Sequence, residues 1–412
     1  MKKHLLALSA AAVLLAPQTV GAEGFSINEW SAEGFAMGGA RMFAENDAAN
    51  MAFNPASLTK IKGEVAKISA TYISPHGKYK CYATDTQEFP AGTPGAFGHN
   101  RVHPAWAPGM YYVKQINDKE WIGFGSYARF GNSCQFQPGS MPGMNNTSSK
   151  VNGMSVGLNY AKKLNKKWSA SLGAEVNYAW LQVDKTMYRN TAIKAQIEGE
   201  SYALGWNVAA NYAFDDKNEM GIVYRSAVNH SMDANVRGNL LRGMTDAYGC
   251  VTLPESVMIG YGHKFNDKTR VELNGTWTRW SRFDALNMKY NNMGGHAHPD
   301  PKNWKDGWRY AIGIEHKLSD KYSLLGGIAH DESSIPDYYG PGTEGADFMV
   351  PTGTRTTFTI GTQYHDEKQT VAFTIGYMKV GDLAIEGDGF YDHADMYDSY
   401  TKLVSISYQY NF

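Results

Sequence analysis

The stretch WSASLGAEVNYAW, residues 168–180, alternates apolar and polar residues and carries an aromatic residue at each end. Because successive side chains of a β-strand point to opposite faces, one face of this stretch is apolar and the other holds the carboxylate of Glu175. Strands of soluble proteins average about 5–6 residues and bury their apolar face. A longer strand with this pattern is typical of a membrane-spanning barrel, in which the apolar face meets lipid.

The same alternation recurs along the chain. We expect strands at 64–74, 106–116, 119–130, 150–163, 168–184, 200–214, 218–231, 251–265, 268–280, 306–318, 321–331, 354–365, 369–381 and 399–412. Short clusters of Asn, Asp, Ser and Lys join pairs of these strands, and Asn and Asp suit tight hairpin turns. The clusters are residues 117–119, 165–167, 215–218, 266–268, 319–321 and 366–368. Short turns at one end and long loops at the other predict an all-β, antiparallel transmembrane barrel of about fourteen strands.

The bulk composition fits this class of protein. The chain has 412 residues, 13% of them aromatic, with a formal net charge of −1 and a mean hydropathy of −0.43. A barrel needs no apolar run of about 20 residues, because only every second strand residue faces lipid. The near-zero charge offers no basic excess to neutralise phosphates, so nucleic acid is not an expected partner.

The beginning of the chain differs from the predicted strands. Residues 1–22 combine a basic start, an apolar run at Leu5–Leu15 and a small-residue site at Val20–Ala22, which predict a cleaved secretory signal peptide. Residues 23–63 are rich in Gly and Ala and lack sustained alternation, so we expect them to form a unit separate from the barrel of residues 64–412. A cleaved signal places the protein in the periplasm or the outer membrane.

The last predicted strand alternates aromatic or aliphatic residues with polar ones and ends on an aromatic residue. Tyr408, Tyr410 and Phe412 resemble the recognition strand that the outer-membrane barrel assembly machinery reads. We therefore expect this machinery to be a partner during assembly.

The three cysteines, Cys81, Cys134 and Cys250, fall in predicted outer loops. In an oxidising compartment they permit either one disulfide with one thiol left over or three unpaired thiols, because spacing does not fix connectivity. Neither a CxxC motif nor a Cys/His cluster occurs, and we expect no metal and no cofactor.

Residues 45–57, ENDAANMAFNPAS, resemble the amino-terminal hatch of the long-chain fatty acid transporter family of outer-membrane proteins, which also includes aromatic-hydrocarbon uptake channels. Further segments are similar to family blocks in family order. They are Gly205–Asn207, Tyr224–Ser226, Leu253–Glu255, Thr278–Phe283, Lys305–Arg309, Gly327–Ser333 and Ile335–Pro336. The resemblance implies a fourteen-stranded barrel in the bacterial outer membrane, closed inside by a plug of residues 23–63.

The resemblance gives the plug a sequence motif, made of Asn50, Asn54, Pro55 and Ala56. Asn side chains can cap neighbouring main-chain groups, and proline fixes φ and removes a donor. We expect these residues to be structural rather than direct ligand contacts.

The predicted third strand resembles the family strand that is kinked and leaves a gap in the wall. It carries Gly123, Gly125 and Gly131. Glycine inside a strand commonly marks a bulge or a close approach of backbone. These glycines therefore predict either a lateral opening or room for the plug.

The family resemblance implies passive uptake of a hydrophobic small molecule, captured at the outer loops and released through the wall into the membrane. No phosphate-binding loop suggests ATP use. Outer-membrane lipids and lipopolysaccharide are expected neighbours of a monomer. Charged residues of the predicted lumen either bind a carboxylate head group or pair with one another and with the plug. They are Glu175, Arg225, Glu272, Arg309, Glu315 and Arg355.

The chain departs from the fatty-acid members of the family at two places. Their loop between the fifth and sixth strands is long, apolar and helical, whereas here only Lys185–Gly199 is available. Residues 178–180 read Tyr-Ala-Trp where the prototype has an Arg. A smaller or less amphiphilic ligand than a long-chain fatty acid fits these differences at least as well.

Other functions of a barrel would require other sequence features. A general diffusion porin would have an open lumen and no plug. An enzyme would need a Ser/His or Asp/His constellation, and no G-x-S-x-G occurs. An adhesin or structural barrel could bind calcium at the acidic loop Glu386–Asp398, which lacks EF-hand spacing. His296 and His298 could bind a metal, although an exposed polar loop is the simpler interpretation.

Overall fold

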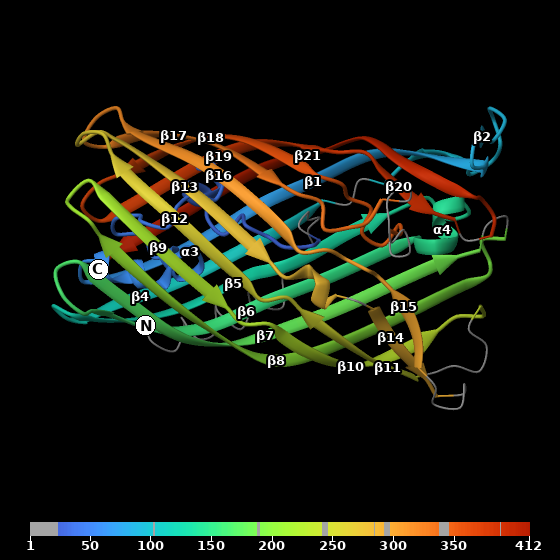
Figure 1. Ribbon diagram of the computed structural model, residues 1–412, viewed down its shortest axis with the longest axis horizontal. Coiled ribbons are helices and arrows are strands. Elements are labelled where there is room, and N and C mark those ends of the chain that lie inside the picture. Colours follow the sequence, from blue (N-terminus) through green and yellow to red (C-terminus); the bar gives the residue numbers. More distant parts are fainter. Residues whose placement is uncertain are drawn as a thin grey trace.

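A computed structural model describes residues 24–101, 104–187, 190–240, 246–283, 285–291, 297–337, 346–387 and 389–412. These residues form one antiparallel sheet that closes into a long barrel (Figure 1). The predicted signal peptide, residues 1–22, lies outside them. In the described part of the chain, no helix is long and apolar enough to cross a membrane.

The wall has fourteen strand positions, which confirms the predicted fold class. Single strands fill most of them: β1 (Glu64–Thr84), β4 (Ala105–Asn117), β5 (Glu120–Gln135), β6 (Ser148–Lys163), β7 (Trp168–Thr186), β8 (Lys194–Ala213), β17 (Tyr322–Asp331), β18 (Arg355–His365), β19 (Gln369–Val380) and β21 (His393–Asn411). The other positions are each interrupted: β9 (Asn218–Arg225) with β10 (Val228–Arg237), β11 (Asp246–Leu253) with β12 (Ser256–Lys264), β13 (Thr269–Thr278) with β14 (Ala285–Tyr290), and β15 (Ala297–Pro301) with β16 (Gly307–Lys317). β1 pairs with β21, from Val65 opposite Asn411 to Tyr82 opposite His393, and this pairing closes the barrel.

Side-chain exposure follows the predicted alternation. On β7, Leu172 is 61% exposed whereas Glu175 is 3% exposed. Ile360 on β18 is likewise 52% exposed. At the turn end of the wall, the rings of Trp168 and Tyr212 lie against each other with centroids 4.8 Å apart. An outward apolar band that ends in aromatic rings matches the girdle that barrels place at the lipid–water interface.

The short turns close by one repeated contact. In each turn, the side-chain oxygen of the first residue accepts a hydrogen bond from the backbone N–H two residues later. The donors are Lys119, Lys167, Lys217, Lys268, Lys321 and Lys368. The accepting side chains are Asn, Asp or Ser, which explains why these residue types begin the clusters. The carboxyl terminus lies at the same end of the barrel (Figure 1).

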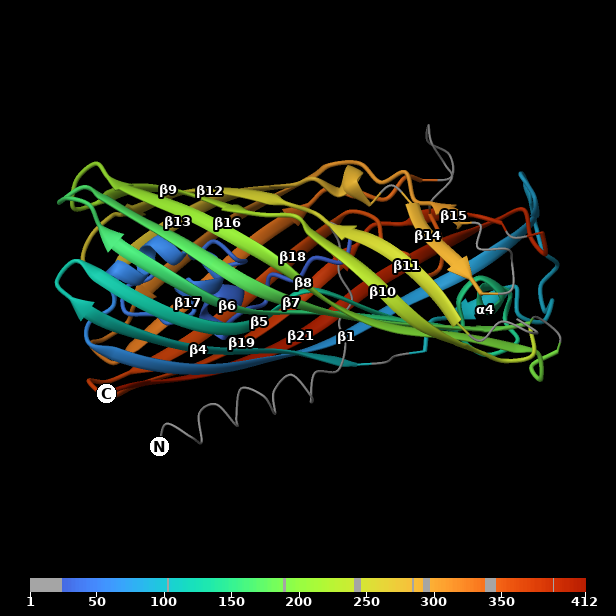
Figure 2. The same ribbon diagram turned by 90° about the horizontal axis from the view of Figure 1, so that it is seen from below.

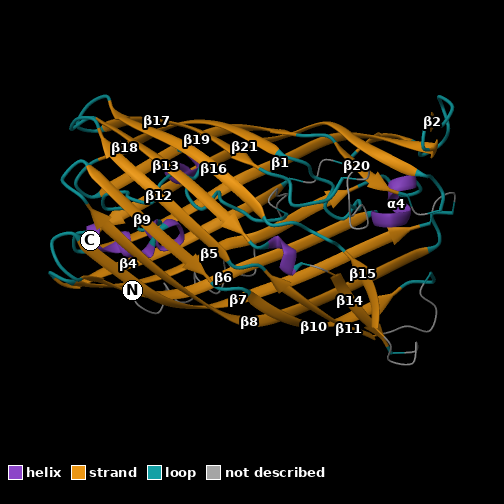
Figure 3. Cartoon of the chain, viewed as in Figure 1, coloured by secondary structure: helices purple, strands orange, loops and turns teal. Residues whose placement is uncertain are grey.

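The amino-terminal segment, defined here as residues 24–63, lies inside the barrel and is almost wholly buried (Figures 1 and 3). It contains α2 (Ala32–Ala36), α3 (Asn50–Phe53) and the 3₁₀ helix η1 (Pro55–Lys60). The remaining short elements are β2 (Gln87–Glu88), β3 (Phe97–His99), α4 (Met141–Asn146), η2 (Trp280–Arg282) and β20 (Leu383–Glu386). Of these, α4 lies at the end of the barrel opposite the carboxyl terminus (Figure 2).

Several strands extend further toward that opposite end than the sequence predicts, because the alternation that marks a lipid-facing strand fades there. As a result, the cysteines were wrongly placed in loops: Cys81 lies on β1, Cys134 on β5 and Cys250 on β11. All three are described, and none forms a disulfide bond. The predicted loop 185–199 is also shorter than expected, because β7 ends at Thr186 and β8 begins at Lys194.

Candidate functional site

Buried ion pairs fix the amino-terminal segment to the wall. Lys67 of β1 lies 2.9 Å from Glu33 and 2.6 Å from Asp47, and its side chain is 1% exposed. Arg41 contacts Asp47 at 3.0 Å and Glu315 of β16 at 3.2 Å. Burial alone raises the pKa of the Asp47 carboxyl, but Lys67 and Arg41 outweigh burial and bring this pKa well below its usual value. These charges therefore hold the segment in one position.

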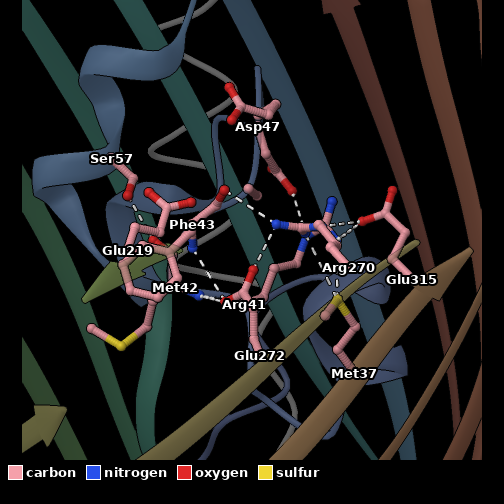
Figure 4. A network of polar contacts seen from close by, with 12 residues as sticks. Met37, Arg41, Met42, Phe43, Asp47, Ser57, Glu219, Arg270, Glu272 and Glu315 are labelled. Carbon is pink, nitrogen blue, oxygen red and sulfur yellow. Dashed lines mark hydrogen bonds and ion pairs between the residues drawn. The ribbon is translucent and has the colours of Figure 1, made fainter. Parts of the chain in front are cut away.

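A second group of contacts joins the segment to β13 and β16 (Figure 4). The backbone N–H of Met42 donates to Glu272 at 2.6 Å. Arg270 contacts Glu272 at 2.6 Å and Glu315 at 2.9 Å, and it also donates to the carbonyl of Phe43 at 3.1 Å. Irregular backbone inside a barrel needs such partners, since every buried N–H and C=O must be paired.

The other predicted lumen charges are paired as well. Glu175 contacts Arg129 and lies 3.9 Å from Arg225, and Arg225 donates to the carbonyl of Ala52 at 2.6 Å. Arg309 contacts Asp331 on a neighbouring strand and the carbonyl of Gly38 in the amino-terminal segment. Arg355 lies 3.8 Å from the same Asp331. These contacts favour the inward ion-pair interpretation over binding of a ligand head group.

The asparagines of the plug motif serve the backbone. Asn54 caps η1 by accepting from the N–H of Ala56 at 3.1 Å, and it donates to Asn211 of β8 at 2.6 Å. Asn50 donates to the carbonyl of Ala44 at 2.9 Å. Pro55 is the first residue of η1, where a missing N–H costs least. The structural role that we expect for this motif agrees with these contacts.

The glycines of β5 lie on both sides of a change in strand pairing. A Cβ on Gly123 would meet Met51 at 2.4 Å, and one on Gly125 would meet Met51 at 3.3 Å, so these two positions make room for the segment. The ladder between β4 and β5 ends at Gly109 opposite Tyr127. Gly131 lies beyond this point.

Beyond Tyr127, the edge of β5 that faces β4 bonds to the amino-terminal segment instead. The N–H of Ile27 donates to the backbone carbonyl of Arg129 at 2.9 Å. The N–H of Gly131 donates to the backbone carbonyl of Phe25 at 2.8 Å. On its other edge, β5 shifts register against β6 between Ala128 and Phe130, which makes Arg129 a bulge. The wall at this place is completed by a segment that belongs to the interior.

An apolar cavity, called here the outer cavity, lies in the lumen beyond the segment. Its volume is about 60 Å³. Most of its lining is apolar and includes Ala179, Met232, Leu253, Phe283 and Trp304. Within its described lining, the charged side chains are Lys302 and Asp347.

Phe25 lines the outer cavity, and the next two residues, Ser26 and Ile27, line a second, inner cavity. The ring of Phe25 lies 4.9 Å from that of Trp280, 5.6 Å from Phe283 and 5.8 Å from Trp304. The breaks between β13 and β14 and between β15 and β16 bring these aromatic side chains into the lumen. The lining of the inner cavity also includes Arg225.

Sequence reasoning did not identify Phe25, Lys302 or Asp347. Each lies outside the predicted strands, where alternation gives no information about direction.

The candidate metal positions give little support for a site. His296 lies outside the described residues, and His298 is on β15. The predicted acidic loop 386–398 is largely strand, because β20 ends at Glu386 and β21 begins at His393. In the described chain, Asp85, Asp392 and His393 have possible ligand atoms within 4.8 Å of one another, a geometry that exposed acidic groups often reach without an ion.

Comparison with known proteins identifies the family. The family model described as outer membrane protein transport protein (OMPP1/FadL/TodX) matches residues 12–412. The chain belongs to this family. Its members are transport proteins rather than enzymes. They are also outer-membrane proteins, and this chain is therefore an outer-membrane protein.

Relatives in the family span most of the chain at low identity. A long-chain fatty acid transport protein of Escherichia coli O6:H1 is 25% identical over 373 residues, which cover 80% of this chain and 82% of the relative. Outer membrane protein P1 of Haemophilus influenzae is 24% identical over 409 residues, covering 88% of this chain and 87% of the relative.

Solved structures of the family share the fold. A FadL homologue of Pseudomonas aeruginosa has a TM-score of 0.80 at 17% identity, covering 94% of this chain and 100% of that one. The toluene transporter TodX of Pseudomonas putida has a TM-score of 0.70 at 15% identity, covering 93% and 99%.

Proposed function

We propose that the protein carries hydrophobic small molecules across the outer membrane by passive diffusion. The observation that carries this proposal is the outer cavity, an apolar chamber inside the barrel next to a plug that buried ion pairs hold to the wall. The free energy of an apolar compound falls when it moves from water into such a chamber. The names of the relatives, a fatty acid transport protein and a toluene transporter, support the same class of ligand.

We infer further that the ligand leaves sideways, into the membrane. The amino-terminal segment occupies the lumen as a plug and is fixed to the wall by buried ion pairs, so a straight path to the periplasm would require breaking them. The edge of β5 at Arg129–Gly131 is instead bonded to Phe25–Ile27. Release of this short pairing would open the wall next to Phe25, which borders the outer cavity.

A general diffusion porin fits the geometry less well. Its lumen is an open aqueous channel, whereas here Lys67, Arg41 and Arg270 bind the plug to the wall. We propose that the protein works as a monomer, surrounded by outer-membrane lipid and lipopolysaccharide, after the assembly machinery has inserted it through its last strand.

Filling the outer cavity should strongly reduce uptake. Ala179 of β7 is 2% exposed and lines the cavity, so Ala179→Trp places an indole where the ligand would lie. Accumulation of a labelled alkylbenzene and of labelled oleate by cells that depend on this protein is expected to fall by about tenfold or more. The measurement is the initial rate of accumulation at equal amounts of protein in the outer membrane.

Ala174→Trp is the matched control, because Ala174 lies on the same strand with its side chain exposed toward lipid. It should accumulate both compounds at the wild-type rate. Equal accumulation by the wild type and the Ala179→Trp variant would exclude the outer cavity from the path.

A further inference from the structure

We infer that the outer cavity binds apolar molecules that carry a neutral oxygen group, with a hydroxyl as the best match, and that Trp304 and Asn132 recognise this group. The inference rests on the proposed function and names its ligand class. It depends on two buried polar atoms in the lining of the cavity that have no hydrogen-bond partner in the described chain.

The indole N–H of Trp304 is the first of these atoms. Trp304 lies in the break between β15 and β16, lines the cavity and is 4% exposed. A Cβ added to Gly24 would clash with Cζ3 of its ring, and in an indole Nε1 lies at the opposite end from Cζ3. The donor is therefore on the side of the ring away from the amino-terminal segment, and no described residue accepts a hydrogen bond from it.

The side-chain carbonyl of Asn132 is the second atom. Asn132 of β5 is fully buried and also lines the cavity. Its Nδ2 donates to the backbone carbonyl of Met349 at 2.6 Å and to Oγ of Ser149 at 3.1 Å. Because a backbone carbonyl can only accept, the contact with Met349 fixes which end of the amide is Nδ2. Oδ1 is left as a buried acceptor to which no described group donates.

Other polar groups of the lining already have partners. Oγ of Ser149 donates to the carbonyl of Met349 at 2.6 Å and accepts from Asn132, and Lys302 contacts Asp347 at 2.5 Å. Among the described residues that line the inner cavity, no buried side-chain nitrogen or oxygen lacks a partner. The two unpaired atoms therefore distinguish the outer cavity as the place where a ligand finds polar contacts.

The chemistry of the two atoms determines which ligands suit them. A buried donor or acceptor without a partner costs free energy, and a ligand that supplies the partner removes this cost. An ether oxygen can accept from Trp304 but cannot donate to Asn132, whereas a hydroxyl can bond to either residue. A carboxylate can only accept, and it brings a charge that apolar walls disfavour. A hydrocarbon satisfies neither atom.

Three ligands of similar size separate these contacts: ethylbenzene has no polar atom, anisole has an oxygen that only accepts, and benzyl alcohol has a hydroxyl. Binding to the detergent-purified protein is measured by isothermal titration calorimetry, with the detergent alone as the blank. Affinities are expressed relative to ethylbenzene, because a change in cavity volume affects all three ligands. In Trp304→Phe, the relative affinities for anisole and benzyl alcohol should each fall by about fivefold, since the N–H is lost.

Trp280→Phe is the matched control. The ring of Trp280 lies 5.1 Å from that of Trp304, and its N–H is likewise buried without a partner in the described chain. Trp280 is not among the residues that line the outer cavity. The same substitution there should leave the relative affinities for anisole and benzyl alcohol as in the wild type.

Asn132→Leu tests the second atom separately from the first. The relative affinity for benzyl alcohol should fall by about fivefold, while that for anisole should not change, because anisole has no proton to donate. Folding of each variant is checked by heat-modifiable gel mobility. Should a variant fail to fold, a crystal of the wild type soaked with 4-bromoanisole decides: bromine marks one end of the ligand, and the oxygen at the other end should lie within hydrogen-bond distance of Nε1 of Trp304.

The inference is overturned if Trp304→Phe and Trp280→Phe have the same relative affinities, or if the bromine of 4-bromoanisole lies next to Trp304 in place of the oxygen. An equal loss of anisole and benzyl alcohol in Asn132→Leu would contradict the role of Asn132. Each of these results leaves the proposed function intact, since ethylbenzene still binds. Failure of the wild type to bind ethylbenzene would instead overturn the proposed function, and this inference with it.

Discussion

Lys67→Met is expected to destabilise the folded protein and to make its lumen leak ions. Lys67 lies between Glu33 and Asp47 with a side chain that is 1% exposed. Asp47 keeps Arg41 as a partner, but both carboxylate oxygens of Glu33 lack a hydrogen bond in the described structure and depend on this ion pair. Removing one partner of a buried ion pair typically costs about 3–5 kcal/mol. The loss should fall on the contacts of the plug rather than on the ladders of the wall.

Two measurements check this expectation: thermal unfolding of the purified protein and ion conductance in planar bilayers. Lys114→Met is the matched control, because the side chain of Lys114 is 53% exposed and pairs with Glu64 at the surface. Such exposed pairs contribute about 0–1 kcal/mol, so the control should unfold and conduct like the wild type. If Lys67→Met behaves as Lys114→Met does, the buried ion pairs do not hold the plug.

A disulfide between positions 26 and 130 is expected to stop uptake reversibly. Ser26 lies opposite Phe130 in an antiparallel bridge, and the flanking bonds from Ile27 to Arg129 and from Gly131 to Phe25 make it a non-hydrogen-bonded pair. Cα atoms of such pairs lie about 4.5 Å apart, within the range of about 4.4–6.8 Å that a disulfide bridges. A cross-link here would lock the segment onto the edge of β5.

The experiment uses Ser26→Cys and Phe130→Cys in a chain whose native cysteines are replaced by alanine. In oxidised cells, accumulation of a labelled alkylbenzene should fall to about a tenth or less, as expected when an opening step is blocked, and a reductant should restore it. The Phe130→Cys single variant controls for the loss of the Phe130 ring, which packs on Phe25. Wild-type accumulation by fully cross-linked protein would mean that ligands do not leave past β5.

The membrane-spanning part of the fold was predictable because lipid imposes a strict rule on sequence. Successive side chains of β7 alternate between the lipid-facing side and the inside of the barrel. The sequence therefore predicts that Leu172 points outward and Glu175 inward. The turns were predictable for a similar reason. The side-chain oxygen of an Asn or Asp at the first position accepts a hydrogen bond from the backbone N–H two residues later. Both signals act over a few residues.

The outer ends of the strands and the candidate site lacked such local rules. Around Cys134 the side chains on both faces of β5 are buried, so no alternation of polar and apolar residues marks this part of the chain as a strand. For Gly123 the sequence left two interpretations open, a lateral opening or room for the plug, and only the structure shows that a Cβ there would meet Met51 of the plug. The pairing of Lys302 with Asp347 joins residues 45 apart in sequence, and no pattern within either segment points to the other.

The most direct test of the account is a crystal structure of the protein soaked with bromodecane, read from the anomalous signal of bromine. We expect bromine inside the barrel, in the outer cavity next to Met232, Leu253 and Trp304. Bromine found solely on the lipid-facing surface, with the cavity empty at saturating ligand, would contradict the claim that apolar compounds pass through this chamber.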